Sequence, residues 1–397
     1  MRILQICSKP PFPAVDGGCV TSVSLANSLI EKGHSLKVFC LATYKHPFQP
    51  DRMPENFLHQ SDLECVTIDS RVKLIPALLS LFEKESYNLY RFFSPEADQT
   101  LIRIVTEENF DCIILDGLYT SVYLQGLQYY SRAKIILRQH NIEWKVWKTL
   151  ADKESNPFKR YYYKLASQKI EKHEKAVLQE VDTVIGISEE ETNTLQDCTN
   201  KPCIWIPAGM KTGKGWPNYS NLDCQFVGSM DWTPNKEGVI WFLEEVWPKV
   251  NQLVPGSNFH LAGRSMPPPI QSKNLPGFVK LGFLESLDEF WKISGVLVAP
   301  LLSGGGLKIK IIEAMVNGLA VLTTSHGAEG LPGIPGHHYL VAKNADEFIT
   351  HLSQVLVNPE YKQILGERAK ELANACFGET FIAEKWDHTL QTILSNP

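Results

Sequence analysis

The chain has 397 residues, of which 44% are hydrophobic and 21% charged, and a formal net charge of −5. This length exceeds one ordinary hydrophobic core, so it predicts two domains of a globular protein. The small negative charge gives no indication of nucleic-acid binding. Nine scattered cysteines, with no C-x-x-C pair, indicate reduced thiols rather than a disulfide framework or a zinc site.

The sequence also lacks the marks of export. No apolar run approaches the length needed to cross a bilayer, and the first residues, MRILQICS, predict a strand rather than a signal peptide. We therefore expect an intracellular, cytoplasmic protein.

The first half alternates between buried strands and helices. Short apolar runs predict strands at 2–8, 36–40, 112–116, 134–140 and 183–188. Helical spacing of apolar residues begins at Cys19 and stops at Gly33, and a long polar helix is expected from about Pro157 to Gln179. This β-α-β alternation predicts a parallel sheet with helices on both faces.

The second half repeats the pattern, which predicts a second Rossmann-like α/β domain. Its apolar runs predict a helix at 239–250 and strands at 224–229, 258–263, 279–283, 296–300 and 320–324. We place the boundary near 207–220, and expect the last helix, from about Glu379, to cross back to the first domain. The predicted domains are 1–208 together with about 380–397, and 209–379.

The stretch SGGGLKIKIIEAMVNG, residues 303–318, combines bare backbone with charge at the start of a predicted helix. A helix N-terminus has unpaired N–H groups that favour an anion. On a helix, Gly306, Lys310 and Glu313 share one face. The alternative is a glycine-rich loop that caps a core helix, with Lys310 and Glu313 as an ordinary ion pair.

The sequence lacks the motifs that identify several other classes of enzyme and binding site. There is no G-x-G-x-x-G fingerprint after a strand and no G-x-S-x-G elbow, and GMKTGKG (209–215) lacks the Walker spacing. No Asp-x-Asp pair exists for a metal held by a sugar nucleotide, and the adjacent His337 and His338 suit a loop better than a metal site. We expect no metal and no cofactor.

Polar residues and glycines follow several of the predicted strands. In open α/β sheets, ligands bind beyond the carboxyl ends of the strands. The candidates at these ends are Gly17, Gly18, His140, Gly228, Ser229, Arg264, Gly282, Phe283 and the SGGG segment. Two such domains facing one another would bring both sets to a single cleft.

These segments resemble a GT-B glycosyltransferase of the group 1 (family 4) retaining type. The resemblance covers nearly the whole chain, and its most specific part is 304–331. The segments that carry it are 3–18, 138–144, 182–191, 206–210, 226–238 and 304–331. The resemblance implies an α/β fold of two facing Rossmann-like domains, with the acceptor bound by the N-terminal one and the nucleotide-sugar donor by the C-terminal one.

The resemblance also implies roles for residues. Glu313 would hold the ribose hydroxyls, Lys308 and Lys310 would neutralise the diphosphate, and His140 would contact the donor sugar or the acceptor. Further residues on the donor side would be Gly17, Gly18, Gly228, Ser229, Lys236, Arg264, Gly282, Phe283, Gly304, Gly305 and Gly306. Residues on the acceptor side would be Asp16, Arg138 and Asn141.

Two departures from the family pattern matter. Gly305 stands where family members commonly carry the first of two glutamates, so a side chain that usually touches the donor sugar is missing. Ser229 and Met230 occupy the usual arginine region, which leaves Lys236 as the cation there. We infer that Lys308 or Lys310 takes over the lost charge.

The resemblance implies transfer of a sugar from a nucleotide-sugar donor, UDP- or GDP-linked, with retention and without a metal. The acceptor would be a glycan, a lipid-linked molecule or a small molecule, as in polysaccharide or glycoconjugate biosynthesis. One alternative is a nucleotide-sugar epimerase of the same plan. Another is a GT-B-like binding subunit without turnover, which the loss of the glutamate at Gly305 allows.

Residues 143–177 carry nine Lys or Arg against five Asp or Glu, interleaved with aromatic residues. Basic residues with interfacial aromatics are able to dock on an anionic membrane, which indicates a peripheral contact through 144–175. The alternative is a solvated helix whose aromatic side chains pack on its own domain.

Overall fold

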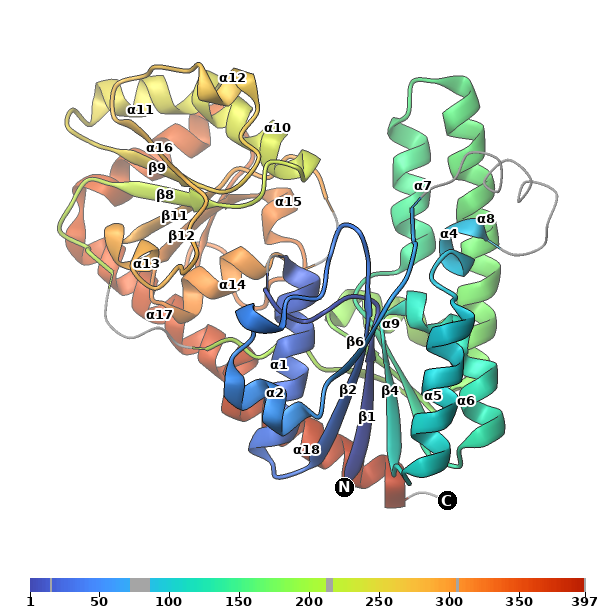
Figure 1. Ribbon diagram of the computed structural model, residues 1–397. Helices are drawn as coiled ribbons and strands as arrows, with labels where there is room; N and C mark the ends of the chain where they lie inside the picture. The colour runs from blue at the N-terminus through green and yellow to red at the C-terminus, as the bar shows by residue number, and fades with distance from the viewer. Residues whose placement is uncertain (15, 72–85, 212–216, 305–306, 396–397) are drawn as a thin grey trace. The chain divides into compact units, whose positions relative to one another are not determined.

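The structure is a computed structural model that describes residues 1–14, 16–71, 86–211, 217–304 and 307–395. It divides the chain into two units (Figure 1). Unit 1 comprises Met1–Gly209 and Ile382–Pro397, and unit 2 comprises Met210–Phe381. Each unit has its own sheet and its own core.

Unit 1 contains a seven-stranded sheet in the order β3-β2-β1-β4-β5-β6-β7, and each strand pair is parallel. The strands are β1 (Arg2–Cys7), β2 (Ser35–Ala42), β3 (Glu64–Thr67), β4 (Cys112–Asp116), β5 (Lys134–Gln139), β6 (Thr183–Gly186) and β7 (Cys203–Trp205). The central strands are buried along almost their full length because helices cover both faces.

The helices of unit 1 pack as two layers, one on each face of this sheet (Figure 1). The layer with α1 also holds α18, whose Ile382, Trp386 and Leu390 belong to the same core cluster as residues of β1, β2 and β4. The helices of unit 1 are α1 (Gly17–Glu31), α2 (Glu55–Ser61), α4 (Tyr87–Tyr90), α5 (Pro95–Glu107), α6 (Leu124–Tyr130), α7 (Glu143–Lys153), α8 (Pro157–Glu180), α9 (Glu189–Gln196) and α18 (Glu379–Ser395). A 3₁₀ helix, η2 (Leu118–Tyr123), follows β4.

Unit 2 contains a six-stranded parallel sheet in the order β10-β9-β8-β11-β12-β13. The strands are β8 (Cys224–Val227), β9 (Phe259–Ala262), β10 (Phe278–Gly282), β11 (Val296–Ala299), β12 (Ala320–Thr324) and β13 (Leu340–Ala342). The helices are α10 (Thr233–Trp241), α11 (Trp247–Leu253), α12 (Pro268–Gln271), α13 (Phe290–Ile293), α14 (Ile309–Val316), α15 (Ser325–Ala328), α16 (Ala345–Val357) and α17 (Pro359–Phe377). An aromatic cluster with Phe242, Trp247, Phe259 and Phe348 fills the core between β9 and the neighbouring helices.

The structure confirms the predicted fold class, two parallel α/β units with helices on both faces. All ten predicted strands are present, with ends that differ by at most two residues. Three short edge strands, β3, β7 and β13, were not predicted. The helix expected at 239–250 begins earlier, at Thr233, and passes through a π-helical turn at Phe242–Val246 before α11.

Candidate functional site

Both sheets reverse their strand order beside the strand that begins the unit. Counted within each unit, the order starts 3-2-1-4-5-6, which is the doubly wound arrangement. The chain therefore leaves β1 and β4 toward opposite faces in unit 1, and β8 and β11 in unit 2. A crevice for a ligand is expected at this switch point, beyond the carboxyl ends of those strands.

In unit 2, the side chain of Lys310 lies at this switch point. Lys310 is on the first turn of α14, which follows β11, and its Nζ donates a short hydrogen bond to Oδ1 of Asn235 on α10, which follows β8. Asn235 Nδ2 in turn donates to the carbonyl oxygen of Ser229 at 2.8 Å. The ammonium also lies 4.6 Å from the ring centroid of Phe226 on β8. We call Phe226, Gly228, Asn235, Lys310 and Glu313 the Lys310 cluster.

Gly228 leaves the room that this arrangement needs. A Cβ at Gly228 would lie 2.7 Å from Asn235 Nδ2 and 3.1 Å from Lys310 Nζ, so any side chain would push the amide and the ammonium away. Gly263, after β9, has φ +153°, and a Cβ there would lie 1.9 Å from the Gly228 carbonyl oxygen. Gly228 therefore supplies bare backbone beside a partly buried cation.

Burial brings the pKa values of Lys310 and Glu313, the two charged groups on α14, close to neutral pH. It lowers the pKa of Lys310 to about 7, with the nearby Lys308 acting in the same direction and Glu313 opposing it. Burial likewise raises the pKa of Glu313 to about 7, against the attraction of Lys310. Lys308, at the N-cap of α14, is itself buried. An anion placed here would meet two lysines and the positive end of the helix dipole.

The polar groups after β8 and β9 form a second set of contacts. Arg264 Nε donates to Ser229 Oγ at 3.1 Å, and its guanidinium lies 3.6 Å from Asp231. The Ser229 hydroxyl also donates to Asp231 at 3.2 Å. The structure thus brings together Ser229 and Arg264, two residues predicted for the donor side.

The remaining residues predicted for the donor side of unit 2 are placed as follows. Gly282 ends β10 with φ +73°, and the next side chain, Phe283, is 56% exposed. Lys236 is partly buried on α10. Gly304 has φ +98°, and a Cβ there would lie 3.0 Å from the Pro234 ring. Gly305 and Gly306, also predicted for the donor side, fall outside the described residues.

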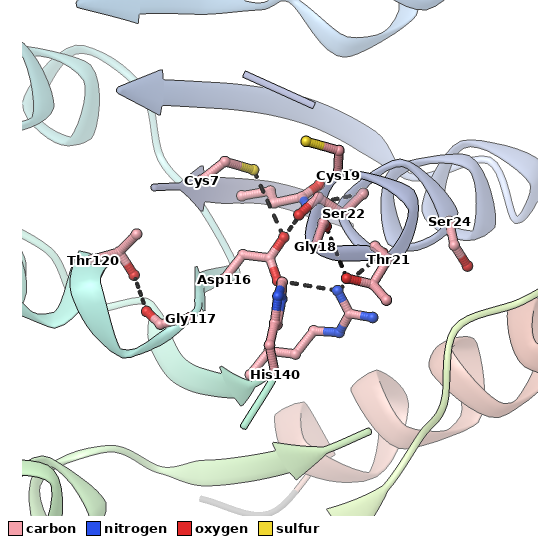
Figure 2. Close-up of polar contacts among 12 residues, drawn as sticks. Cys7, Gly18, Cys19, Thr21, Ser22, Ser24, Asp116, Gly117, Thr120 and His140 are labelled. Carbon is pink, nitrogen blue, oxygen red and sulfur yellow. Dashed lines mark hydrogen bonds and ion pairs between the residues drawn. The ribbon is translucent and has the colours of Figure 1, made fainter. Parts of the chain in front are cut away.

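In unit 1, the corresponding switch point holds a buried carboxylate, Asp116, at the end of β4 (Figure 2). Asp116 Oδ1 lies 2.6 Å from His140 Nε2 and accepts from Arg138 Nη1 at 3.0 Å. Its Oδ2 accepts from Gln5 Nε2 at 2.9 Å and lies 3.7 Å from the Cys7 thiol. These five residues, which we call the Asp116 cluster, come from β1, β4 and the end of β5.

The neighbouring charges keep Asp116 ionised. Burial alone would raise the pKa of its carboxyl, but His140 and Arg138 hold that pKa well below its usual range. An ionised carboxylate only accepts hydrogen bonds, so His140 Nε2 carries a proton and Nδ1 is left as the acceptor in the neutral ring. Asp116 is fully buried, whereas the His140 side chain is 19% exposed. Asp116 therefore orients His140 without itself being accessible to a ligand.

Arg138 and Asn141 had been expected on the acceptor side. Arg138 is fully buried inside unit 1. Its Nη1 donates to Asp116 and to the Thr21 carbonyl oxygen. Asn141 is partly buried in the loop after β5, where its side chain hydrogen-bonds to Glu143.

Glu174 on α8 forms hydrogen bonds to the residues on both sides of His140 in the sequence. The buried Glu174 carboxyl group accepts from Gln139 Nε2 at 2.7 Å and from the backbone N–H groups of Glu143 at 3.3 Å and Trp144 at 3.2 Å. It therefore caps the N-terminus of α7. Burial raises the pKa of Glu174 to about 8.

The start of α1 also lies at the unit 1 switch point. Asp16 is its N-cap and accepts from the Cys19 N–H at 3.0 Å, while Lys9 Nζ lies 2.7 Å from the Asp16 carboxylate. Burial would raise the pKa of Asp16, but Lys9 and the cap hydrogen bond lower it to about 2. Gly17 and Gly18 begin the helix, and a Cβ at Gly18 would lie 2.9 Å from Lys9 Nζ.

Several residues near these switch points were not predicted, among them Asp116, Asn235 and Lys9, although the sequence contains a sign of the first two. Asp116 is the charged residue that ends the apolar run CIILD, and Asn235 lies in the TPNKEG segment that opens α10. Lys9 follows β1 directly, in the proline-rich loop. Among the residues that the structure describes, no three His, Cys, Asp or Glu side chains gather into a set able to hold a metal ion.

Comparison with known proteins shows which proteins this chain resembles. Residues 222–358, which contain the Lys310 cluster, match the model of the family described as Glycosyl transferases group 1. Over 402 aligned residues the chain is 24% identical to an uncharacterized 44.6 kDa protein in the cps region of Klebsiella pneumoniae, with 97% of this chain and 96% of that protein covered.

Solved structures show the same fold. A sucrose-phosphate synthase from Thermosynechococcus elongatus superposes with a TM-score of 0.72 at 16% identity, over 100% of both chains. HepE from Anabaena, in complex with UDP-glucose, superposes with a TM-score of 0.67 at 13% identity, over 99% of this chain and 100% of that one. Residues 222–358 thus resemble the group 1 glycosyltransferases, and the two doubly wound units share the GT-B fold of these solved structures.

Proposed function

We propose that this protein is a glycosyltransferase that moves a sugar, with retention at the anomeric carbon, from a UDP- or GDP-sugar to a glycan, lipid-linked or small-molecule acceptor. The observation that carries the proposal is the partly buried ammonium of Lys310, held by Asn235 beside the bare backbone of Gly228 at a switch point. The HepE structure with UDP-glucose supports the choice of a nucleotide sugar. The relative in a cps region supports a place in polysaccharide biosynthesis.

In this proposal, the Lys310 cluster binds the donor. The diphosphate lies at the N-terminus of α14, where Lys308 and Lys310 neutralise the charge that grows on it as the glycosidic bond breaks. Glu313, one turn further on the same face, accepts hydrogen bonds from the ribose hydroxyls. The two lysines replace the arginine that is absent at Ser229, and they supply the positive charge that a metal ion supplies in other transferases.

The Asp116 cluster serves the sugar and the acceptor. His140, oriented by Asp116, offers its accessible ring for hydrogen bonds to the transferred sugar or to the acceptor hydroxyl. The resemblance to retaining glycosyltransferases implies that the donor's own phosphate takes the acceptor proton, so we assign His140 a positioning role. Asp16, Gly17 and Gly18 would complete this side through the start of α1.

We first expect loss of donor affinity when Lys310 is replaced by Met. A charge-assisted hydrogen bond contributes about 1.5–3 kcal/mol, so UDP or GDP binding should weaken roughly 10- to 150-fold, and UMP or GMP binding should weaken less. Glu313→Gln should weaken all four nucleotides alike, because the ribose is common to them. Calorimetric titration measures both effects.

The matched control is Lys249→Met, because Lys249 is an exposed lysine of α11 in the same unit, with a side chain 59% exposed. It should leave every nucleotide affinity unchanged. Wild-type affinity in both Lys310→Met and Glu313→Gln would refute the donor site, and the proposed function with it.

A second expectation concerns pH. With a pKa near 7, Lys310 keeps its proton below that pH and loses it above. A diphosphate binds the protonated form, so its affinity should fall as the pH rises above about 7, by at most tenfold per pH unit. Titrations across this range at low ionic strength measure the slope. Lys310→Met should show a shallower alkaline limb, because only Glu313 of this pair still titrates near pH 7. An equally steep limb in that variant would assign the titration to another group.

A third expectation separates His140 from donor binding. His140→Ala should lower turnover by about 100-fold or more while nucleotide affinity stays within about twofold, because the residues assigned to the nucleotide belong to unit 2. The Asp116–Arg138 ion pair remains in this variant, so the unit should stay folded, as circular dichroism can verify. A parallel loss of nucleotide affinity would show that His140 acts on the donor's nucleotide instead.

The last expectation of this kind is transfer without a divalent ion. We propose that Lys308 and Lys310 neutralise the charge of the diphosphate without a metal ion. Initial rates should therefore be the same with excess EDTA and with added Mg²⁺ or Mn²⁺. Activity that disappears with the chelator and returns with the metal would contradict the assignment.

A further inference from the structure

The α7–α8 hairpin consists of a base that packs on unit 1 and a tip that does not. At the base, the Trp147 and Tyr163 rings lie 5.8 Å apart, and the Ser167 hydroxyl donates to the Trp144 carbonyl oxygen at 2.9 Å. Trp144 and Trp147 pack against the small core cluster of Leu89, Leu118 and Ile170. These aromatic residues of the 144–175 stretch are therefore structural.

The tip of the hairpin exposes large apolar side chains. Leu150 near the end of α7 is 46% exposed, and Phe158 and Tyr161 in the first turn and a half of α8 are 85% and 66% exposed. The outer turns of α7 and α8 extend past the other elements of unit 1 (Figure 1). An apolar side chain is less favourable in water than when it is covered, and unit 1 leaves these three largely uncovered.

The same tip is strongly basic. Residues 145–164 contain six basic and two acidic side chains, a net charge of about +4 in a chain whose formal net charge is −5. All six basic side chains are exposed: Lys145, Lys148, Lys153, Lys159, Arg160 and Lys164. Lys159 and Arg160 stand between Phe158 and Tyr161 in sequence, so cations and apolar rings share one small surface.

We propose that this tip docks on the surface of an anionic lipid bilayer. Phe158, Leu150 and Tyr161 would enter the headgroup boundary, where the tyrosine hydroxyl stays hydrated, and the basic side chains would lie among the lipid phosphates. A polyanion in solution would satisfy the basic residues alone, whereas a bilayer also takes up the apolar rings. In the described part of the chain, no helix is long and apolar enough to cross a membrane, so this contact is peripheral.

The inference goes beyond the proposed function, because it concerns where the enzyme works and involves none of the residues assigned to donor or acceptor. A hairpin tip held at a bilayer surface would keep unit 1 beside a lipid-linked acceptor, whose polar head lies at that surface. Of the acceptor classes proposed above, docking therefore favours the lipid-linked one.

The test is sedimentation of the full chain with phospholipid vesicles. Vesicles of phosphatidylcholine mixed with phosphatidylglycerol should bind the protein, and vesicles of phosphatidylcholine alone should bind it much less. Binding should weaken when salt rises from about 0.1 M to about 1 M, because the Debye length falls from about 10 Å to about 3 Å.

Two variants separate the charge from the apolar contribution. The double variant Lys159→Gln/Arg160→Gln should lower the vesicle partition coefficient about 25-fold, since each charge near an anionic surface contributes about a fivefold factor. Phe158→Ser should lower it about tenfold or more. All three positions are exposed, so the variants should unfold at the wild-type temperature.

The control variant is Tyr129→Ser/Arg132→Gln, which removes one exposed ring and one exposed cation elsewhere on unit 1. It should bind vesicles like the wild type. Equal binding to both kinds of vesicle, or equal losses in the control and tip variants, would overturn the proposal. So would an oligomer that Phe158→Ser dissociates, because the tip would then be an interface between copies. Calorimetry with UDP or GDP on the same proteins keeps this outcome separate from a failure of the donor site.

Discussion

The reversal of strand order beside β1 and β8 is the constraint on which the candidate sites depend. In a parallel sheet all carboxyl ends lie at one edge, and helices cross to opposite faces only where the order reverses. The loops that follow β8 and β11 therefore separate, and Asn235 and Lys310 meet between them although they are 75 residues apart. In unit 1 the same geometry brings His140 to Asp116 from 24 residues away.

The fold could largely be predicted from the sequence because its inner strands are buried on both faces. Such strands are continuous apolar runs, as in CIILD and AVLTT, and their predicted bounds agree with the structure. The edge strands β3, β7 and β13 have four residues or fewer, and β7 is only partly buried, so they lack this signal. The early start of α10 was hidden because Pro234 suits a first helical turn as well as a loop.

The site could be predicted only as far as single strand ends. His140, Gly228 and Lys310 each follow a strand or open a helix, which the sequence shows directly. Which of them touch one another depends on three-dimensional contacts, and so Asp116 and Asn235, whose importance lies wholly in their partners, were not predicted. The basic and aromatic stretch after His140 shows the same limit. Its composition is uniform, but the structure assigns Trp147 to a core and Phe158 to the surface.

The two clusters hold buried charge in opposite ways, and this difference fits the roles proposed for them. Asp116 is surrounded by Arg138, His140 and the Gln5 amide, so its charge is compensated within unit 1 and its pKa is low. Lys310 donates to the amide oxygen of Asn235, which carries only a partial charge, and the attraction of Glu313 does not offset burial and the repulsion of Lys308. Burial is therefore under-compensated at Lys310, whose pKa falls to about 7, and an arriving diphosphate would supply the missing counter-charge. The first arrangement suits a fixed support for His140, and the second suits a site completed by its anionic ligand.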